Sequence, residues 1–324
     1  MKTKDFQNSQ ERKDILMRKQ VLYSIRSPYR QPMEITGFKF GSGEKAICVV
    51  GAMRGNEIQQ MYVCSQLVRR LKELEREGSI CGGKEILIVP CVNYYSMNIG
   101  KRFWTMDNTD INRMFPGYDM GETTQRIADG LFKEVQGYTY GVQLASFYQQ
   151  GDFLPHVKLM ETGFTDHKDM IDFGLPYAFV RTPRPYDTTT LNYNWQVWET
   201  KAFSVYTNAT DNIDDASAKI AVDAVIRYMV KRGIVKTKVT GGSVTEIVDE
   251  RGLVQIHSPC AGICKSYVRP GDEIRKGDLL CEIIDPLEGE VISKIFAPVN
   301  GIIFFSYNRP LEFEKSVLYK IIKI

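Results

Sequence analysis

The sequence has no apolar run of the length that a membrane span needs. A transmembrane helix takes about 20 consecutive apolar residues, and no stretch of this chain approaches that length. The first twenty residues are polar and mixed in charge, so they lack the apolar region of a secretory signal peptide. From these absences we expect a cytoplasmic protein with no membrane contact.

A strong net charge is absent as well. Lysine and arginine number 42 against 39 aspartates and glutamates, which leaves a net charge of +3. That balance gives no support for nucleic acid or a membrane surface as a partner, although it permits local basic pockets. We therefore expect a small molecule rather than a polyanion as the ligand.

A disulfide framework is absent from the sequence pattern. The seven cysteines are odd in number, and most lie in apolar or strand-like runs. Free thiols in a reducing compartment are the expected state. Cys260 and Cys264 form a C-x3-C pair, but the sequence offers no second pair and only His257 nearby, so we do not expect zinc there.

Strands alternate with helices over most of the chain. Residues 21–41 predict two antiparallel strands, and residues 44–52 predict a buried strand. Apolar residues at a spacing of three and four then predict a helix that begins at Ile58 and ends near Gly78. Further strands and helices follow to about residue 235. This order indicates an α/β domain over residues 1–239, with a mixed, mostly parallel sheet covered by helices on both faces.

The composition changes near Thr240. Residues 240–324 carry short strand patterns, glycines and prolines, and predict a small all-β domain. The segment also repeats itself, because "SPCAGICKSYVRPG" is echoed by "APVNGIIFFSYNRPL" at an offset of 39 to 40 residues. Such a repeat predicts two interlocked halves related by a pseudo-twofold axis.

Two polar motifs follow predicted strands of the α/β domain. The first is "GAMRGNE", which contains Arg54 and Glu57, and the second is "DNTDINRMFPG", which contains Asn112 and Arg113. Loops at the carboxyl ends of parallel strands collect binding sites. An arginine fork is well suited to a carboxylate ligand, and Arg102 is placed to join Arg113. The competing interpretation is that Arg113 pairs with Asp110 and only stiffens the loop.

The order of these motifs resembles the succinylglutamate desuccinylase/aspartoacylase family, from about Val21 to Val235. Members carry G-x-H-G-N-E, then D-x-N-R-x-F-P-G, then a strand ending in D-L-H and a strand carrying a glutamate. "FLPHVKLMETG" is also similar. The resemblance implies a zinc carboxypeptidase-like fold and hydrolysis of amide bonds in N-acyl amino acids. Residues 240–324 resemble a barrel-sandwich domain of the biotinyl/lipoyl type, without the lysine turn of a covalently bound cofactor.

The resemblance implies one zinc ion held by His, Glu and His, with a glutamate as general base. The first histidine falls on Arg54, the glutamate survives as Glu57, and the second histidine falls on Ala145. The general base falls on Tyr206. The pocket residues that the resemblance implies for an acidic substrate survive as Arg102, Asn112 and Arg113, and we add Arg54 to them.

Arg54 is the unusual residue of this set. A buried carboxylate without its metal would be left uncompensated, which costs several kcal/mol. Arg54 lies three residues before Glu57, so an Arg54–Glu57 pair is expected to replace the contact with the metal. His156 is the histidine considered as a replacement ligand, and we expect it instead to bond to the backbone of a loop.

Three hypotheses remain open from the sequence. The first is a family member that has lost zinc hydrolysis and retains an arginine-lined pocket for an acidic amide or amino acid. It would act as a homo-oligomer or beside an active relative. The second is an active metal-dependent deacylase with a relocated site, built from Glu57, Asp107, Asp110 or His156, with the polar and aromatic residues 183–203 around it. The third is an interaction module in which residues 240–324 dock a partner or build an oligomer.

Overall fold

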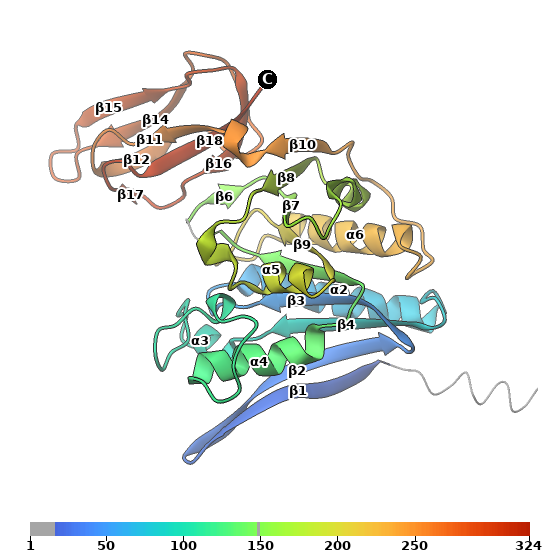
Figure 1. The fold of residues 1–324 in the computed structure, drawn as a ribbon. Helices are drawn as coiled ribbons and strands as arrows, with labels where there is room; N and C mark the ends of the chain where they lie inside the picture. Colours follow the sequence, from blue (N-terminus) through green and yellow to red (C-terminus); the bar gives the residue numbers. More distant parts are fainter. Residues whose placement is uncertain (1–16, 148–149) are drawn as a thin grey trace, which may run out of the picture.

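A nine-stranded sheet runs through the larger part of the molecule (Figure 1). The structure is a computed structural model that describes residues 17–147 and 150–324. The strand order is β1-β2-β4-β3-β5-β9-β7-β8-β10. The elements of this part are β1 (Arg18–Ser27), β2 (Arg30–Gly41), β3 (Glu44–Ala52), α2 (Ile58–Arg76), β4 (Lys84–Cys91), α3 (Tyr94–Met97), α4 (Thr123–Val135), β5 (Tyr140–Ala145), β6 (Asp152–Phe153), β7 (His156–Met160), β8 (Tyr177–Arg181), α5 (Leu191–Val197), β9 (Lys201–Tyr206), α6 (Asp215–Lys231) and β10 (Glu246–Asp249).

The prediction of a mixed, mostly parallel sheet is confirmed. Neighbouring strands are parallel from β4 through β3 and β5 to β9, and again from β7 through β8 to β10. The antiparallel pairs are β1 with β2, β2 with β4, and β7 with β9. The hairpin predicted over residues 21–41 is the pair β1 and β2.

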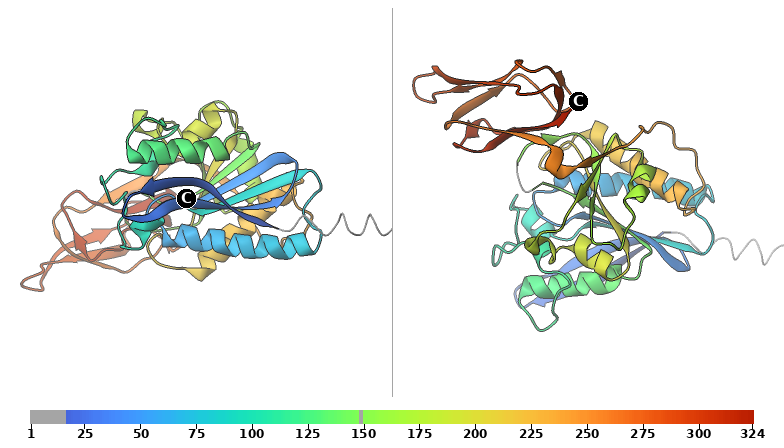
Figure 2. Two further views of the ribbon diagram at one scale, coloured as in Figure 1. Left: turned by 90° about the horizontal axis from the view of Figure 1, so that it is seen from below. Right: turned by 45° about the horizontal axis from the view of Figure 1, so that its top comes forward.

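Helices cover both faces of the sheet, as predicted (Figure 2). Strand β3 shows why, because Ile47 and Val49 point into a core shared with α2 and α6. Cys48 and Val50 alternate with them and point into a second core shared with α4 and α5. A strand that is buried on both sides has no polar face, which explains its continuous apolar run.

The chain leaves the large sheet later than the sequence suggested. Strand β10 lies beyond the predicted boundary at 239/240, yet it pairs in parallel with β8. The change of sheet comes after Asp249, where a short 3-10 helix η4 (Glu250–Gly252) leads to β11. That residues 240–324 are an independent domain stays a prediction.

The remaining strands form two small sheets. They are β11 (Val254–His257), β12 (Gly262–Ser266), β13 (Glu273–Ile274), β14 (Leu279–Ile284), β15 (Val291–Phe296), β16 (Gly301–Ser306), β17 (Leu311–Glu312) and β18 (Val317–Lys323). The first copy of the repeat contains β12, and the second contains β16. Strand β12 pairs with β17 of the second half, and β16 pairs with β13 of the first half. This reciprocal pairing is the arrangement predicted for two interlocked halves.

The two parts of the molecule share an aromatic core. Strand β6, which follows the loop after β5, pairs with β16. The backbone N–H of Leu154 also donates to the carbonyl of Phe304 at 3.1 Å. Around this junction Phe153, Phe179 and Phe304 are buried together. The C-terminal part is therefore fastened to the larger part by backbone hydrogen bonds and by apolar packing.

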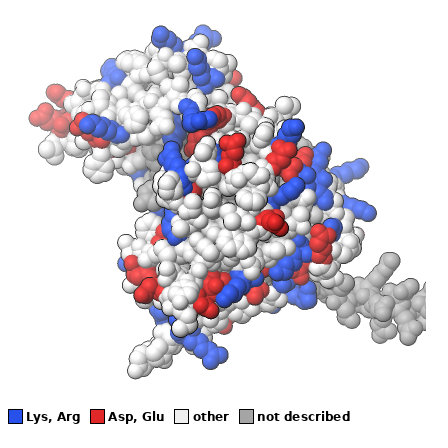
Figure 3. All heavy atoms as spheres, viewed as in Figure 1, with Lys and Arg blue, Asp and Glu red and all other residues white. Residues whose placement is uncertain are grey.

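All seven cysteines are free thiols, as predicted. Within residues 17–147 and 150–324, no helix combines the length and the hydropathy that crossing a bilayer requires. Acidic and basic side chains are interspersed over the face drawn in Figure 3, in keeping with the balanced composition.

Phe304→Ala should destabilise the whole protein by roughly 3–5 kcal/mol, because it removes a large buried side chain from the shared core. Phe313→Ala is the matched control. Phe313 lies in the same C-terminal part but is 77% exposed, against 2% for Phe304, so its loss should cost about 0.5 kcal/mol or less. Urea unfolding of both variants measures the difference. Equal effects would contradict a core shared between the two parts.

Candidate functional site

The carboxyl ends of β3, β5 and β9 meet beside a cavity of about 1080 Å³. Its walls come from both parts of the molecule, because they include Arg54 and Tyr206 from the large sheet together with Glu250 and Lys320 from the C-terminal region. Seven lysines and arginines but only three carboxylates line the cavity. The site is therefore enriched in positive charge, which the net charge of the chain does not reveal.

Arg54 forms the predicted pair with Glu57 and a second pair that was not predicted. Its Nη1 donates to Glu57 Oε1 at 3.0 Å. Its Nε and Nη2 donate to Asp110 Oδ2 at 3.1 and 2.8 Å. Arg54 is 5% exposed and Glu57 is 1% exposed. The interpretation that Asp110 pairs with Arg113 is thus wrong, because Asp110 holds Arg54.

The carboxylate of Glu57 is fully engaged. Its Oε2 accepts the backbone N–H groups of Met53 and Arg54 at 2.8 and 2.9 Å. Its Oε1 accepts Arg54 and also the hydroxyl of Ser146. Burial alone would lower the pKa of Arg54, but the carboxylates of Glu57 and Asp110 outweigh burial and raise this pKa above its ordinary value. Arg54 is therefore a permanent cation at this position.

Ala145 and Tyr206 lie side by side at the strand ends. The parallel pairing of β5 and β9 sets Ala145 opposite Tyr206, and both line the cavity. The methyl group of Ala145 offers no ligand atom. Burial raises the pKa of the Tyr206 phenol, so this hydroxyl stays protonated at neutral pH and does not serve as a proton acceptor in the way a carboxylate does.

His156 lies on β7 rather than in the expected loop. It is 0% exposed, and its Nδ1 is 2.7 Å from the carbonyl of Leu154, so the predicted backbone bond is present. Its ring stacks on Tyr206 with centroids 4.7 Å apart. Burial, and next the nearby Lys158, hold the pKa of His156 well below its ordinary value. The ring is thus a neutral part of an aromatic cluster.

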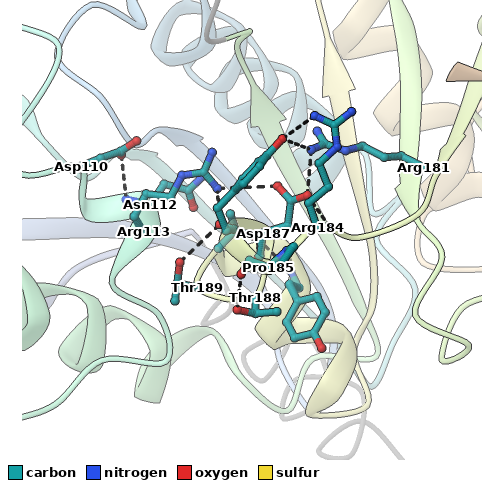
Figure 4. Close-up of polar contacts among 12 residues, drawn as sticks. Asp110, Asn112, Arg113, Arg181, Arg184, Pro185, Asp187, Thr188 and Thr189 are labelled. Carbon is teal, nitrogen blue, oxygen red and sulfur yellow. Dashed lines mark hydrogen bonds and ion pairs between the residues drawn. The ribbon is translucent and has the colours of Figure 1, made fainter. Parts of the chain in front are cut away.

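Three arginines surround a single carboxylate at one end of the cavity (Figure 4). Asp187, on the 3-10 helix η3 (Pro185–Asp187), is 2% exposed and accepts Arg181 Nη2 at 2.8 Å. Arg113 approaches from the other side, with Nη1 3.8 Å from Asp187 and 2.9 Å from the carbonyl of Tyr186. Arg184 Nη1 donates to the Tyr186 hydroxyl at 2.7 Å. Asp187 and Glu250, whose Oε2 is 3.9 Å from Arg181 Nε, are fewer than the three cations of this arginine cluster (Arg113, Arg181 and Arg184), which keeps excess positive charge.

Asn112 and Arg102, the two other predicted pocket residues, lie in different places. Asn112 lines the cavity and is 7% exposed, and its Oδ1 accepts the N–H of Leu191, the first residue of α5. Arg102 does not line the same cavity in the described part of the chain. It lies on a neighbouring hollow of about 700 Å³ together with Arg309, and its Nη2 donates to the carbonyl of Phe147 at 3.4 Å. The expectation that Arg102 joins Arg113 in one pocket is therefore not met.

The sequence interpretation missed several residues of the cavity. Arg181 and Arg184 lie near β8 and η3, and Lys158 lies on β7. Glu250 and Lys320 come from beyond the predicted domain boundary. In the aromatic segment 183–203, Tyr186 belongs to the cavity, whereas Trp195 is 0% exposed and packs in the core. Clustered arginines around "VRTPRPYD" were the one local signal that could have indicated the anion site.

The described residues contain no group of three or more histidines, cysteines, aspartates or glutamates arranged to hold a metal ion. Glu57 and Asp110 are both near Arg54, but the guanidinium lies between them and bonds to each. The polar atoms at the strand ends are therefore arranged around an organic cation.

Part of the chain is similar in sequence to a known family of proteins. Residues 44–190 match the model of the succinylglutamate desuccinylase/aspartoacylase catalytic domain. Over 95 residues the chain is 32% identical to the N-alpha-acetyl-L-2,4-diaminobutyric acid deacetylase of Halomonas elongata. That stretch is 29% of this chain and 26% of the length of the deacetylase.

Solved structures extend the similarity to nearly the whole fold. A succinylglutamate desuccinylase/aspartoacylase from Rhodobacter sphaeroides has a TM-score of 0.76 at 17% identity, covering 94% of this chain and 95% of its own. A succinylglutamate desuccinylase from Silicibacter sp. TM1040 has a TM-score of 0.77 at 18% identity, covering 96% of each chain. These likenesses establish the fold, and the family model identifies it by sequence. The sequence similarity to this family is thus confined to residues 44–190, a little under half of the chain, and beyond them the similarity is one of fold.

Proposed function

We propose that this protein binds a small acidic amide or amino acid in the cavity and does not hydrolyse it by the zinc mechanism expected of its family. The observation that carries the proposal is the guanidinium of Arg54, bonded to both Glu57 and Asp110. A cation that is covalently part of the chain stands where the resemblance implies a metal ion.

The residues at the expected zinc positions do not fit that ion. A catalytic zinc needs three protein ligands and one open position. Of the three residues at the expected ligand positions, Glu57 alone has a side chain that can bind zinc. Its two carboxylate oxygens already accept four hydrogen bonds. Arg54 offers only donors, and the side chain of Ala145 offers no polar atom. Tyr206 occupies the position of the general base. The residues at the expected positions therefore neither activate a water molecule nor accept its proton.

Binding of an anion is supported by the charges that remain. Arg54 is neutralised by Glu57 and Asp110, whereas Arg113 and Arg181 of the arginine cluster share Asp187. Lys158 and Lys320 add two more cations around Glu250. A guanidinium recognises a carboxylate through two parallel hydrogen bonds, so the cluster is suited to a carboxylate-bearing ligand.

The alternative is an active metal-dependent deacylase with a relocated site. The similarity to a deacetylase favours it. Of its candidate ligands, Asp110 is held by Arg54, His156 is stacked in the aromatic cluster, and Asp107 is exposed and accepts the N–H of Thr109. A subunit of another protein that supplies the missing groups would be a further form of this alternative.

Arg54→Met should lower the free energy of unfolding by roughly 3–5 kcal/mol, because it leaves the buried carboxylate of Glu57 and the partly buried carboxylate of Asp110 without their cation. Arg70→Met is the matched control. Arg70 also pairs with a glutamate three residues later, but its side chain is 37% exposed, so the loss should stay below about 1 kcal/mol. Chemical denaturation measures both. Equal effects would show that Arg54 does not compensate the buried carboxylates.

An acidic amide should bind more tightly than its uncharged analogue. The probes are N-acetylaspartate and the corresponding diamide, with affinity measured by calorimetry and by the rise in unfolding temperature. Arg184→Gln should weaken the binding of N-acetylaspartate roughly tenfold to a hundredfold, since it removes a charged hydrogen bond. Arg70→Gln should leave it unchanged. Equal affinities for the two probes would refute the anion pocket.

Arg54→His alone should not confer hydrolysis of N-acyl amino acids, because Ala145 and Tyr206 remain unchanged. Release of the free amino acid is the readout. Metal content of the purified protein and of Glu57→Ala is measured alongside it. A stoichiometric metal in the wild type that is lost in Glu57→Ala would overturn the proposal in favour of the relocated site.

A further inference from the structure

Strand β7 presents a lysine to the cavity from the interior of the sheet. In "HVKLM", Val157 and Leu159 point into the core shared with α2 and α6. His156 and Lys158 alternate with them and point to the opposite face. Strands β8 and β9 flank β7 on either side, so Lys158 does not lie at an edge. It is 6% exposed, and it lines the cavity.

The amine of Lys158 has one carboxylate partner and an otherwise aromatic and cationic surrounding. Its Nζ is 3.1 Å from Glu250 Oε1. It lies 4.9 Å from the ring centroid of Phe147 and 5.3 Å from that of Tyr206. The other charged groups that act on it are Arg181 of β8 and Lys320 of β18. His156, on the same strand face, is neutral.

These surroundings make the ammonium of Lys158 easier to deprotonate than that of an exposed lysine. Burial, which is the largest cause, lowers the pKa of Lys158, and the charges of Arg181 and Lys320 lower it further, while Glu250 opposes them. A desolvated lysine beside other cations is a more available nucleophile than an exposed one. A structural ion pair alone would not need an open cavity in front of the amine.

We propose that Lys158 is a nucleophile that forms a reversible imine with an aldehyde or ketone that also bears a carboxylate. The arginine cluster would hold the carboxylate of this oxo acid, so the inference rests on the proposed function for the choice of ligand. Glu250 connects the two groups, because it contacts Lys158 at 3.1 Å and its Oε2 is 3.9 Å from Arg181 Nε.

The step balances without a further reactant. The ammonium of Lys158 gives one proton to the carboxylate of Glu250, and its nitrogen lone pair attacks the carbonyl carbon. A proton passes from nitrogen to the carbonyl oxygen, which yields a neutral carbinolamine. Glu250 then returns its proton to the hydroxyl, which leaves as water while the C–N double bond forms. One ammonium and one carbonyl thus become one protonated imine and one water, and no electron is exchanged with an outside partner.

Reductive trapping on the full-length protein tests this step. The protein is incubated at neutral pH with glyoxylate and cyanoborohydride, which fixes an imine as a stable amine, and the modified lysines are mapped by peptide mass spectrometry. Lys158 should be modified ahead of Lys133, because burial lowers the pKa of Lys158 and makes its amine easier to deprotonate. Lys133 is a suitable internal comparison because its hydrogen bond to Asp129 raises its pKa.

Three variants and a second probe complete the design. Lys158→Arg should abolish the adduct at this position, Glu250→Gln should slow its formation, and Lys133→Arg should leave it unchanged. If the Lys158→Arg variant does not fold, the map of modified lysines in the wild-type protein is sufficient to test the proposal. Glyoxylate labelling confined to exposed lysines would overturn the proposal. Propanal, which lacks a carboxylate, separates the two claims: if it labels Lys158 as fast as glyoxylate does, the imine stands and the acidic-ligand proposal fails. If N-acetylaspartate binds but neither aldehyde labels Lys158, only the imine fails.

Discussion

One buried guanidinium organises the carboxyl ends of the strands. Arg54 joins the loop after β3 to Asp110 in the loop that leads to η1 (Ile111–Arg113), and through Glu57 it reaches Ser146 after β5. Asp110 also caps η1 by accepting the N–H of Asn112 at 3.0 Å. Three loops thus depend on one cation, and the positions of Asn112 and Arg113 at the cavity follow from it.

Local patterns predicted the elements whose stability is local. Strand β3 shows itself by a continuous apolar run, and α6 by Asp214, whose side chain accepts the N–H groups of Ala216 and Ser217 at the helix start. The Arg54–Glu57 pair was predictable for the same reason, since three residues on one chain segment bring the two side chains together. The interlocked C-terminal halves followed from the visible repeat.

Ion pairs between residues far apart in the sequence could not be predicted from the spacing of residues. Asp110 lies closer in sequence to Arg113, but its partner is Arg54, 56 residues away, because burial selects the cation that can be desolvated with it. Strand β7 was not predicted because His156 and Lys158, on the face opposite to its core residues, interrupt the apolar run that is typical of a central strand. Glu250 pairs with Lys158 across 92 residues, and no local signal connects them.

The pairing of β6 with β16 has a consequence for synthesis on the ribosome. Domains generally fold as they emerge from the ribosome, from the N-terminus onward. The cavity, however, is lined in part by Glu250 and Lys320, which are translated after helix α6. Until β16 arrives, the partner edge of β6 is open and Phe153 lacks its cover. The nascent chain therefore carries a half-built pocket with an exposed aromatic face, which is the kind of surface that chaperones bind.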